Sequence, residues 1–164
     1  MNEMTKPAIR GEDHWTTKDG GAARLFMFEK CLGDPAQSRG TILFVHGSSM
    51  ASQPTFDLQV PGRPDSSAMD FFARRGFDCW SVDMEGYGRS TKDRDNNAPI
   101  SMGADDCYAA AQYIQSLRGK RPFLVYGISS GALRAALFAE RRTSAEGQEG
   151  LHAFLERRRP AWRG

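Results

Sequence analysis

The sequence has no long apolar run and little net charge. No stretch approaches the length needed to span a bilayer, and residues 1–11 hold no apolar run of the kind found in a secretory signal. The net charge of +2 is too small to indicate nucleic acid or an anionic membrane as a partner. We therefore expect a cytoplasmic protein that binds neither nucleic acid nor membranes.

Cysteine is scarce and irregularly placed. Cys31, Cys79 and Cys107 are an odd number without the spacing of metal ligands, so we expect reduced thiols rather than a disulfide framework. The sequence shows no metal site and no cofactor-binding motif, and we expect neither a metal nor a cofactor. The length of 164 residues favours a single domain.

What the sequence does contain is centred on a glycine-bearing turn between two apolar stretches. Residues 123–126 are apolar or aromatic, which predicts a buried strand. Residues 132–140 are rich in Ala and Leu, which predicts a helix packed on that strand. Between them lies the pattern G-x-S-x-G, formed by Gly127, Ser129 and Gly131. Such a tight turn holds the serine hydroxyl clear of the sheet edge, near the free amides of the helix N-terminus.

Two interpretations of this turn are open. In the first, a strained backbone presents Ser129 as a nucleophile, and the flanking glycines avoid clashes that a Cβ would make with the neighbouring strand or helix. In the second, Ser129 is an ordinary helix N-cap whose hydroxyl accepts a hydrogen bond from a backbone amide. The rest of the chain has to decide between them.

The other elements predict an α/β fold with a mostly parallel sheet and helices on both faces. An N-terminal hairpin is followed by strand and helix in alternation, three times over. The expected strands cover residues 13–17, 24–31, 41–45, 77–82 and 123–126, and the expected helices cover 67–75, 100–117 and 132–140. The segment 50–66 is rich in Pro, which predicts a long irregular connection.

Three glycine-bearing segments follow strands of this sheet, namely His46–Gly47, Asp83–Ser90 and Gly127–Gly131. Ligands of such sheets bind at the carboxyl ends of the strands, where these segments converge. The three motifs and their order resemble an α/β-hydrolase-fold serine hydrolase, in which they would be the oxyanion loop, the loop after the fourth strand and the nucleophile elbow. The resemblance covers residues 12–141, and it is specific for the superfamily but not for a substrate.

The resemblance implies a reaction. Ser129 would attack the carbonyl of a small-molecule ester or related acyl compound and form an acyl-enzyme. The backbone amide of Ser130 would donate one hydrogen bond to the oxyanion, and the amide of Ser48, or alternatively that of Ser49, would donate the second. The family also hosts lactonases, thioesterases and cofactor-free peroxidases, so the fold alone does not fix the reaction.

Four further residues of these motifs have structural as well as functional interpretations. His46 most resembles a brace of the oxyanion loop rather than a proton carrier. Asp83 most resembles a loop brace or cap rather than the acid of a catalytic triad. Tyr87 either lines the mouth of a pocket or is an ordinary loop aromatic, and Ser90 is interpreted as a turn or cap residue.

The C-terminal part departs from the family pattern. An acid and then a histidine follow the nucleophile in the family order. Here no Asp follows Ser129, and the only later histidine is His152. It is interpreted as a surface residue beside a helix predicted over 146–158, and a role as the base is the alternative. The Arg-rich segment 142–164 resembles the product of a frameshift or a misplaced gene end. The triad acid and base are therefore expected to be missing.

We divide the chain into a loose terminus (1–11), a partial hydrolase-like domain (12–141) and an atypical tail (142–164). Because the later strands of the family sheet are missing, residues 123–126 are expected to form an apolar edge strand, unless the tail covers it. Unpaired apolar edges associate with other chains, so we expect this edge to favour either aggregation or a homodimer.

Two functions are consistent with these features. The first is a serine hydrolase that acts on carboxylic esters through Ser129, impaired by the lack of a triad acid and base. The second is a non-catalytic, truncated hydrolase-like domain that binds small molecules or pairs through its open sheet edge.

Overall fold

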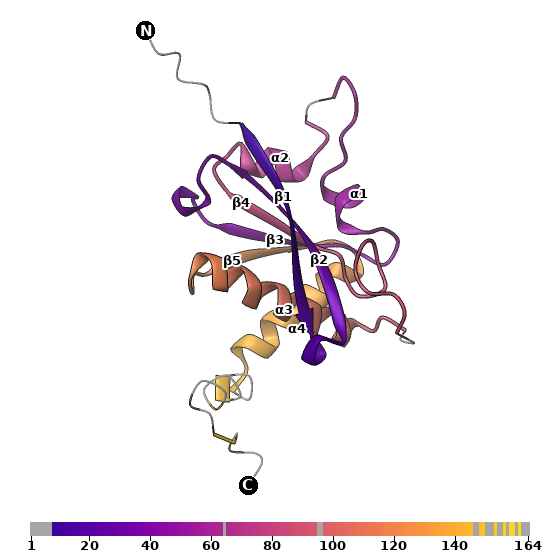
Figure 1. Cartoon of the computed structure of the whole chain (residues 1–164), viewed down its shortest axis with the longest axis vertical. Coiled ribbons are helices and arrows are strands. Elements are labelled where there is room, and N and C mark those ends of the chain that lie inside the picture. The colour runs from indigo at the N-terminus through magenta and orange to yellow at the C-terminus, as the bar shows by residue number, and fades with distance from the viewer. Residues whose placement is uncertain are drawn as a thin grey trace.

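The computed structural model describes residues 8–63, 65–94, 97–145, 148–149, 153, 156, 158–159 and 161. They contain a five-stranded sheet with the strand order β1-β2-β4-β3-β5 (Figure 1). The strands are β1 (Ile9–Lys18), β2 (Ala23–Leu32), β3 (Thr41–Val45), β4 (Asp78–Val82) and β5 (Phe123–Gly127). The α-helices are α1 (Ser52–Phe56), α2 (Ala68–Ala73), α3 (Ile100–Arg118) and α4 (Ser130–Thr143), and 3-10 turns lie at Asp19–Gly21 and Pro35–Gln37.

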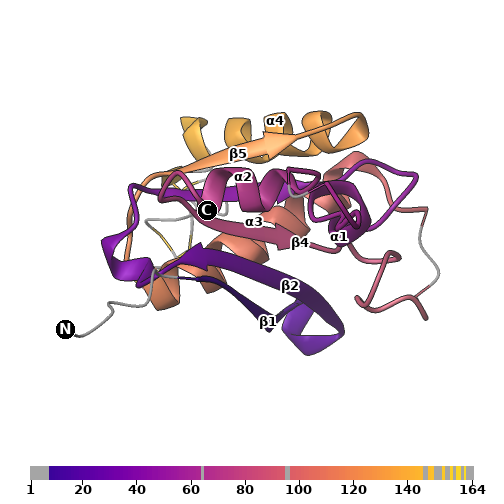
Figure 2. The same ribbon diagram turned by 90° about the horizontal axis from the view of Figure 1, so that it is seen from above.

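The sheet is mixed. The β1–β2 hairpin is antiparallel, and β2 also pairs antiparallel with β4. The strands β4, β3 and β5 run parallel, so their carboxyl ends meet at one edge of the sheet. Figure 2 shows the order of the strands from β5 to β1. The predicted α/β fold, with an N-terminal hairpin and parallel central strands, is confirmed.

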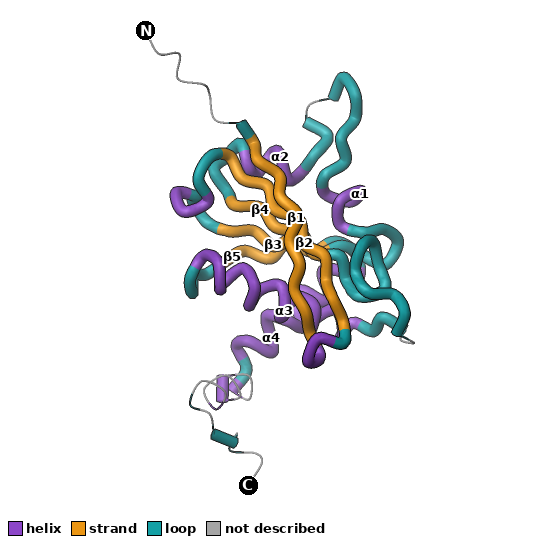
Figure 3. The backbone as a smooth tube through the Cα atoms, in the orientation of Figure 1, coloured by secondary structure: helices purple, strands orange, loops and turns teal. Residues whose placement is uncertain are grey.

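Helices cover both faces of the sheet (Figure 3). The interior strand β3 sends Leu43 and Val45 into the core beneath α3 and α4, and it sends Ile42 and Phe44 into the core beneath α1 and α2. All five residues of β3 are buried. A strand covered on both faces favours apolar residues on both sides, which explains why residues 42–45 show no polar alternation.

Two segments differ from the expectation. The strand β1 begins at Ile9, which pairs with Leu32, so residues 9–11 are strand rather than part of a loose terminus. The segment 50–66 is not wholly irregular, because it contains the one-turn helix α1. Most of the predicted tail helix lies outside the described residues. Within the described ranges, no helix combines the length and the apolar character that crossing a membrane requires.

The strand β5 ends the sheet on one side, and its outer edge has no partner among the described strands. Two of its side chains are unusually exposed for apolar groups, Leu124 at 60% and Tyr126 at 47%. The prediction of an apolar edge strand is confirmed.

Candidate active site

The turn between β5 and α4 holds Ser129 in a strained conformation. Its φ of 54° and ψ of −133° lie outside the regions that non-glycine residues favour. Such a residue costs about 1–3 kcal/mol and persists only where its surroundings fix it. Ser129 stands at the N-cap position of α4, but its side chain makes no capping hydrogen bond and the residue is exposed. The hydroxyl therefore does not have the role that an ordinary N-cap would give it.

Two glycines allow α4 to start so close to the sheet. A Cβ on Gly127 would lie 2.5 Å from the backbone oxygen of Gly131. A Cβ on Gly131 would lie 2.5 Å from the backbone oxygen of His46, and closer still to that of Val45. Backbone atoms cannot move aside cheaply, so a larger residue at either position would push α4 away from β3 and β5. This is the predicted reason for the G-x-S-x-G spacing.

The segment after β3 lies beside Ser129. A Cβ built on Gly47 would lie 3.0 Å from the Cβ of Ser129 and 3.4 Å from its Oγ. Next to this contact, the hydroxyl oxygens of Ser48 and Ser130 lie 2.6 Å apart and share a hydrogen bond. The structure thus brings Ser48, Ser129 and Ser130 together, while Ser49 is an exposed neighbour in the same segment.

His46 holds this segment from the buried side. Its Nδ1 donates to the backbone oxygen of Gly47 at 2.6 Å, and its Nε2 accepts from the backbone amide of Met84 at 3.0 Å. Because an amide can only donate, Nε2 carries no proton and the ring is neutral. Burial lowers the pKa of His46, and this keeps the imidazole ring neutral. An imidazole engaged at both nitrogens cannot take a proton from Ser129, so the interpretation of His46 as a brace is confirmed.

Asp83 is a second brace. One of its carboxylate oxygens accepts from the backbone amide of Ser52 at 2.8 Å and from the hydroxyl of the same residue. The other accepts from the backbone amide of Arg89 at 2.9 Å. The Ser90 hydroxyl donates to the backbone oxygen of Asp83 at 2.6 Å. The contacts of Asp83 tie the start of α1 to the loop after β4 and confirm it as a loop brace, and Ser90 lies in a turn of that loop, where its amide donates to the backbone oxygen of Tyr87.

The sequence reasoning missed Arg134. This residue lies on α4, is 1% exposed, and donates from its guanidinium to the backbone oxygen of His46 at 3.2 Å. The half-buried Tyr87 lies edge-on to the His46 ring, with ring centroids 4.9 Å apart. The centroid of the Tyr87 ring also lies 5.7 Å from the guanidinium carbon of Arg134. A signal was present, because Arg134 is the only charged residue in 130–139. The buried guanidinium of Arg134 thus contacts the segment that follows β3 from the interior of the protein.

The sequence matches a known protein family. Residues 36–151, well over half of the chain, match the family described as serine aminopeptidase, S33. The chain belongs to this family of α/β hydrolases. No protein with a curated description matches the sequence.

Solved hydrolase structures share the fold. A predicted CIB-like hydrolase from Thermoplasma acidophilum superposes with a TM-score of 0.57 at 15% identity, over 83% of this chain and 58% of its own. A carboxyl esterase from Bacillus coagulans superposes with a TM-score of 0.61 at 18% identity, over 80% of this chain and 40% of the esterase. An esterase from Pyrococcus furiosus superposes with a TM-score of 0.58 at 16% identity, over 82% of this chain and 47% of the esterase. This chain therefore spans between 40% and 58% of the length of these relatives in fold.

Neither histidine among the described residues is available to Ser129 as a general base. His46 is engaged at both ring nitrogens. His14 lies on β1, at the other side of the sheet, where its ring nitrogens contact Glu29 at 2.9 Å and the hydroxyl of Tyr113 at 3.1 Å. His152 lies outside the described residues.

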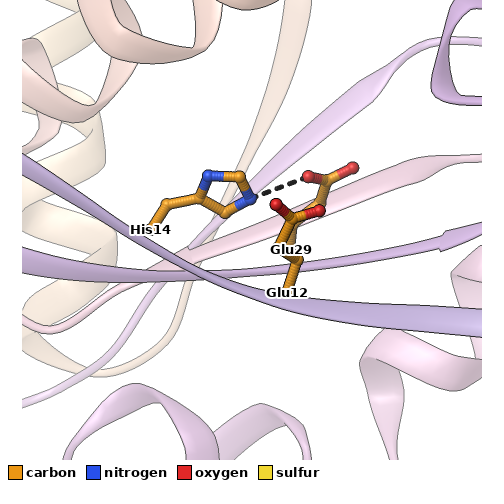
Figure 4. Close-up of side chains that lie close together, drawn as sticks. All are labelled: Glu12, His14 and Glu29. Atoms are coloured by element: carbon orange, nitrogen blue, oxygen red, sulfur yellow. Dashed lines mark hydrogen bonds and ion pairs between the residues drawn. The ribbon is translucent and has the colours of Figure 1, made fainter.

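Glu12, His14 and Glu29 are the one group in the described chain whose donor atoms could surround a metal ion (Figure 4). These atoms lie within 4.8 Å of one another. Glu29 is already neutralised, however, by Arg118 at 2.7 Å and Arg10 at 3.2 Å, and its second oxygen contacts His14. The group therefore needs no ion, and it acts as a polar network that ties the hairpin to α3.

A groove of about 710 Å³ lies between α3, α4 and the start of β5, and Ser129 is not among the residues that line it. Its apolar wall includes Phe123, Val125 and Phe138, and its rim carries the basic residues Lys120, Arg121, Arg141 and Arg142. The groove belongs to the open side of the sheet rather than to the candidate active site.

Proposed function

We propose that this chain carries the nucleophile of a serine hydrolase that acts on small carboxylic esters or related acyl compounds. Ser129 would attack the carbonyl carbon, and the acyl group would be held on its Oγ after the alcohol leaves. The observation that carries the proposal is the positive φ of Ser129 on a turn that sets its Oγ beside Gly47. The esterase names of two relatives in fold support the choice of an ester.

Attack on the ester would place negative charge on the carbonyl oxygen, which preorganised donors must stabilise. We assign the backbone amides of Ser130 and Ser48 to this role, with the amide of Ser49 as the alternative second donor. The hydrogen bond between the Ser48 and Ser130 hydroxyls holds their two segments in register. Loss of one such donor typically costs about 100-fold in rate or more.

The proposal includes slow turnover. Removal of the proton from Ser129 needs a base, and neither described histidine is available for it. An acyl-transfer site without its base retains about 10³–10⁴-fold acceleration over water, from the oxyanion donors and substrate binding. We therefore expect acylation of Ser129 to be measurable but weak.

Labelling with a fluorophosphonate, read by intact-protein mass, tests this assignment. We expect slow addition of one probe to the wild-type chain and none to Ser129→Ala. The matched control is Ser116→Ala, which removes an exposed hydroxyl on α3 and should leave the labelling unchanged. Labelling that persists in Ser129→Ala would contradict the proposal.

The lack of an available histidine among the described residues favours a second candidate function, in which the domain binds small molecules without converting them. A wild-type chain with native circular dichroism that takes up no probe would support this non-catalytic role over the first.

A further inference from the structure

We propose that Arg134 is a positioning residue for the reaction at Ser129, because it holds the oxyanion loop (residues 46–49) against the start of α4. The proposal rests on the proposed function, since it takes the backbone amides of Ser130 and Ser48 as the donors to the oxyanion. It assigns to Arg134 an action through the oxyanion loop rather than on the substrate itself.

Arg134 connects the two segments that carry these donors. It lies on α4 four residues after Ser130, which is about one helical turn, so the two residues occupy the same side of the helix. Its guanidinium donates to the backbone oxygen of His46 at 3.2 Å, two residues before Ser48. One side chain therefore links the helix that begins at Ser130 to the loop that contains Ser48.

The carbonyl oxygens of the oxyanion loop are bound from the interior. That of His46 accepts from Arg134, and that of Gly47 accepts from Nδ1 of the His46 ring at 2.6 Å. In a planar trans peptide the N–H points away from the C=O. The contact with the His46 ring therefore directs the amide of Ser48 away from that ring, and the contact with Arg134 fixes the peptide that precedes it. Donors oriented before the reaction are what stabilisation of an oxyanion requires.

The charge of Arg134 distinguishes it from other largely buried basic side chains. Lys18, Lys30 and Arg118 each contact two carboxylates, at distances between 2.5 and 2.9 Å. Arg134 is buried more deeply, at 1% exposure, yet it forms no ion pair with a carboxylate of the described chain, and its Nε has no hydrogen-bond partner there. A buried charge without a counter-ion destabilises a fold. Such exceptions are expected at functional sites, and here the cation faces the oxyanion loop.

The neighbouring elements make room for this side chain. A Cβ on Gly103 of α3 would lie 2.6 Å from the Nε of Arg134, and closer still to its Cδ. From the loop after β4, the ring of Tyr87 lies within the range of a cation–π contact with the guanidinium. A larger residue at position 103 would therefore displace Arg134 from its place behind the oxyanion loop.

The rate of fluorophosphonate labelling, measured over a range of probe concentrations, tests this role. Arg134→Met keeps the apolar stem and removes the cation. Because the donors are displaced rather than deleted, we expect the maximal labelling rate of Ser129 to fall about tenfold, less than the loss of a whole donor. The probe concentration at half-maximal rate should change by less than about threefold, because donors to the oxyanion act on the transition state.

Two variants keep the cation, and one serves as the matched control. Arg134→Lys retains a charge that can donate to His46, so it should recover most of the labelling rate. Gly103→Ala keeps Arg134 but pushes on its Cδ and Nε, so it should slow the labelling. The control is Arg141→Met, which removes an exposed arginine of the same helix and should label like the wild type.

Labelling of Arg134→Met at the wild-type rate, or an equal loss of rate in Arg141→Met, would overturn the proposal. If Arg134→Met does not fold, a wild-type labelling rate in Gly103→Ala would overturn it instead. Slow labelling in folded Arg134→Met, with recovery in Arg134→Lys, would establish it.

A wild-type chain that takes up no probe would refute the proposed function, and the nitrogen chemical shifts of the His46 ring then test the positioning alone. We expect one neutral tautomer with the proton on Nδ1 in the wild type. Arg134→Met should give a mixture of tautomers, because the Gly47 carbonyl is no longer held against Nδ1, and Gly103→Ala should give the same mixture. Identical His46 shifts in the wild type and the variant that folds would overturn the proposal.

Discussion

Replacing Asp83 by Asn tests whether this residue braces the site or serves as the acid of a triad. In Asp83→Asn one oxygen can still accept from Ser52, but the side-chain nitrogen faces the backbone amide of Arg89, and two donors then meet. Loss of a hydrogen bond to a charged group costs about 1.5–3 kcal/mol, and a stranded buried donor costs about 1–3 kcal/mol more. Because Arg89 is an exposed residue and its amide is only partly buried, we expect a total loss of about 2–4 kcal/mol in unfolding free energy.

Urea denaturation at neutral pH measures this loss. The control is Asp34→Asn, because Asp34 is an exposed cap that accepts from the backbone amide of Ala36 at 2.9 Å, and Asn caps equally well. The control should stay within about 0.5 kcal/mol of the wild type. If Asp83→Asn keeps wild-type stability while its Ser129 labelling falls, Asp83 acts in the reaction and the reasoning is refuted.

Two further predictions concern the packing and protonation of the site. Gly131→Ala should lose about 3 kcal/mol of stability because its Cβ would meet the backbone oxygens of Val45 and His46, whereas Gly20→Ala, in open space at a φ of 65°, should lose about 1 kcal/mol. Equal urea midpoints for these two variants would refute the close approach of α4 to β3. His46→Gln should flatten the pH dependence of stability. Burial keeps the pKa of His46 in the folded chain below the unfolded value of about 6.5, so the unfolded chain binds more protons as the pH falls through that value, and the wild type loses stability. The difference in unfolding free energy between wild type and His46→Gln should therefore shrink between about pH 7 and pH 5, and a constant difference would contradict a neutral brace.

The turn at Ser129 could be predicted because its constraints are local. An apolar strand, two glycines at fixed spacing and an alanine-rich helix leave one way to connect the elements, and the structure shows the expected clashes at Gly127 and Gly131. The convergence of the three loops was predictable because parallel strands end at a common edge. The roles of His46 and Asp83 as braces were suggested by the resemblance of those loops to the hydrolase motifs.

Other features depend on contacts between distant parts of the chain. The strand β1 starts at Ile9 because that residue pairs with Leu32, and no local alternation marks the start. The helix α1 contains Pro54 and is fixed by the bonds of Ser52 to Asp83, which a sequence pattern does not show. The burial of Arg134 depends on its contact with His46 across the α4–β3 packing.

Rescue by an external base measures the central claim most directly. Imidazole supplied in solution can take the proton from Ser129 in place of the base that the described chain lacks. With p-nitrophenyl acetate as substrate, the account predicts a hydrolysis rate that rises with both protein and imidazole, after subtraction of the Ser129→Ala rate, and an acetyl group on the peptide that contains Ser129. Identical rates for wild type and Ser129→Ala at every imidazole concentration, with no acetylated peptide, would contradict it.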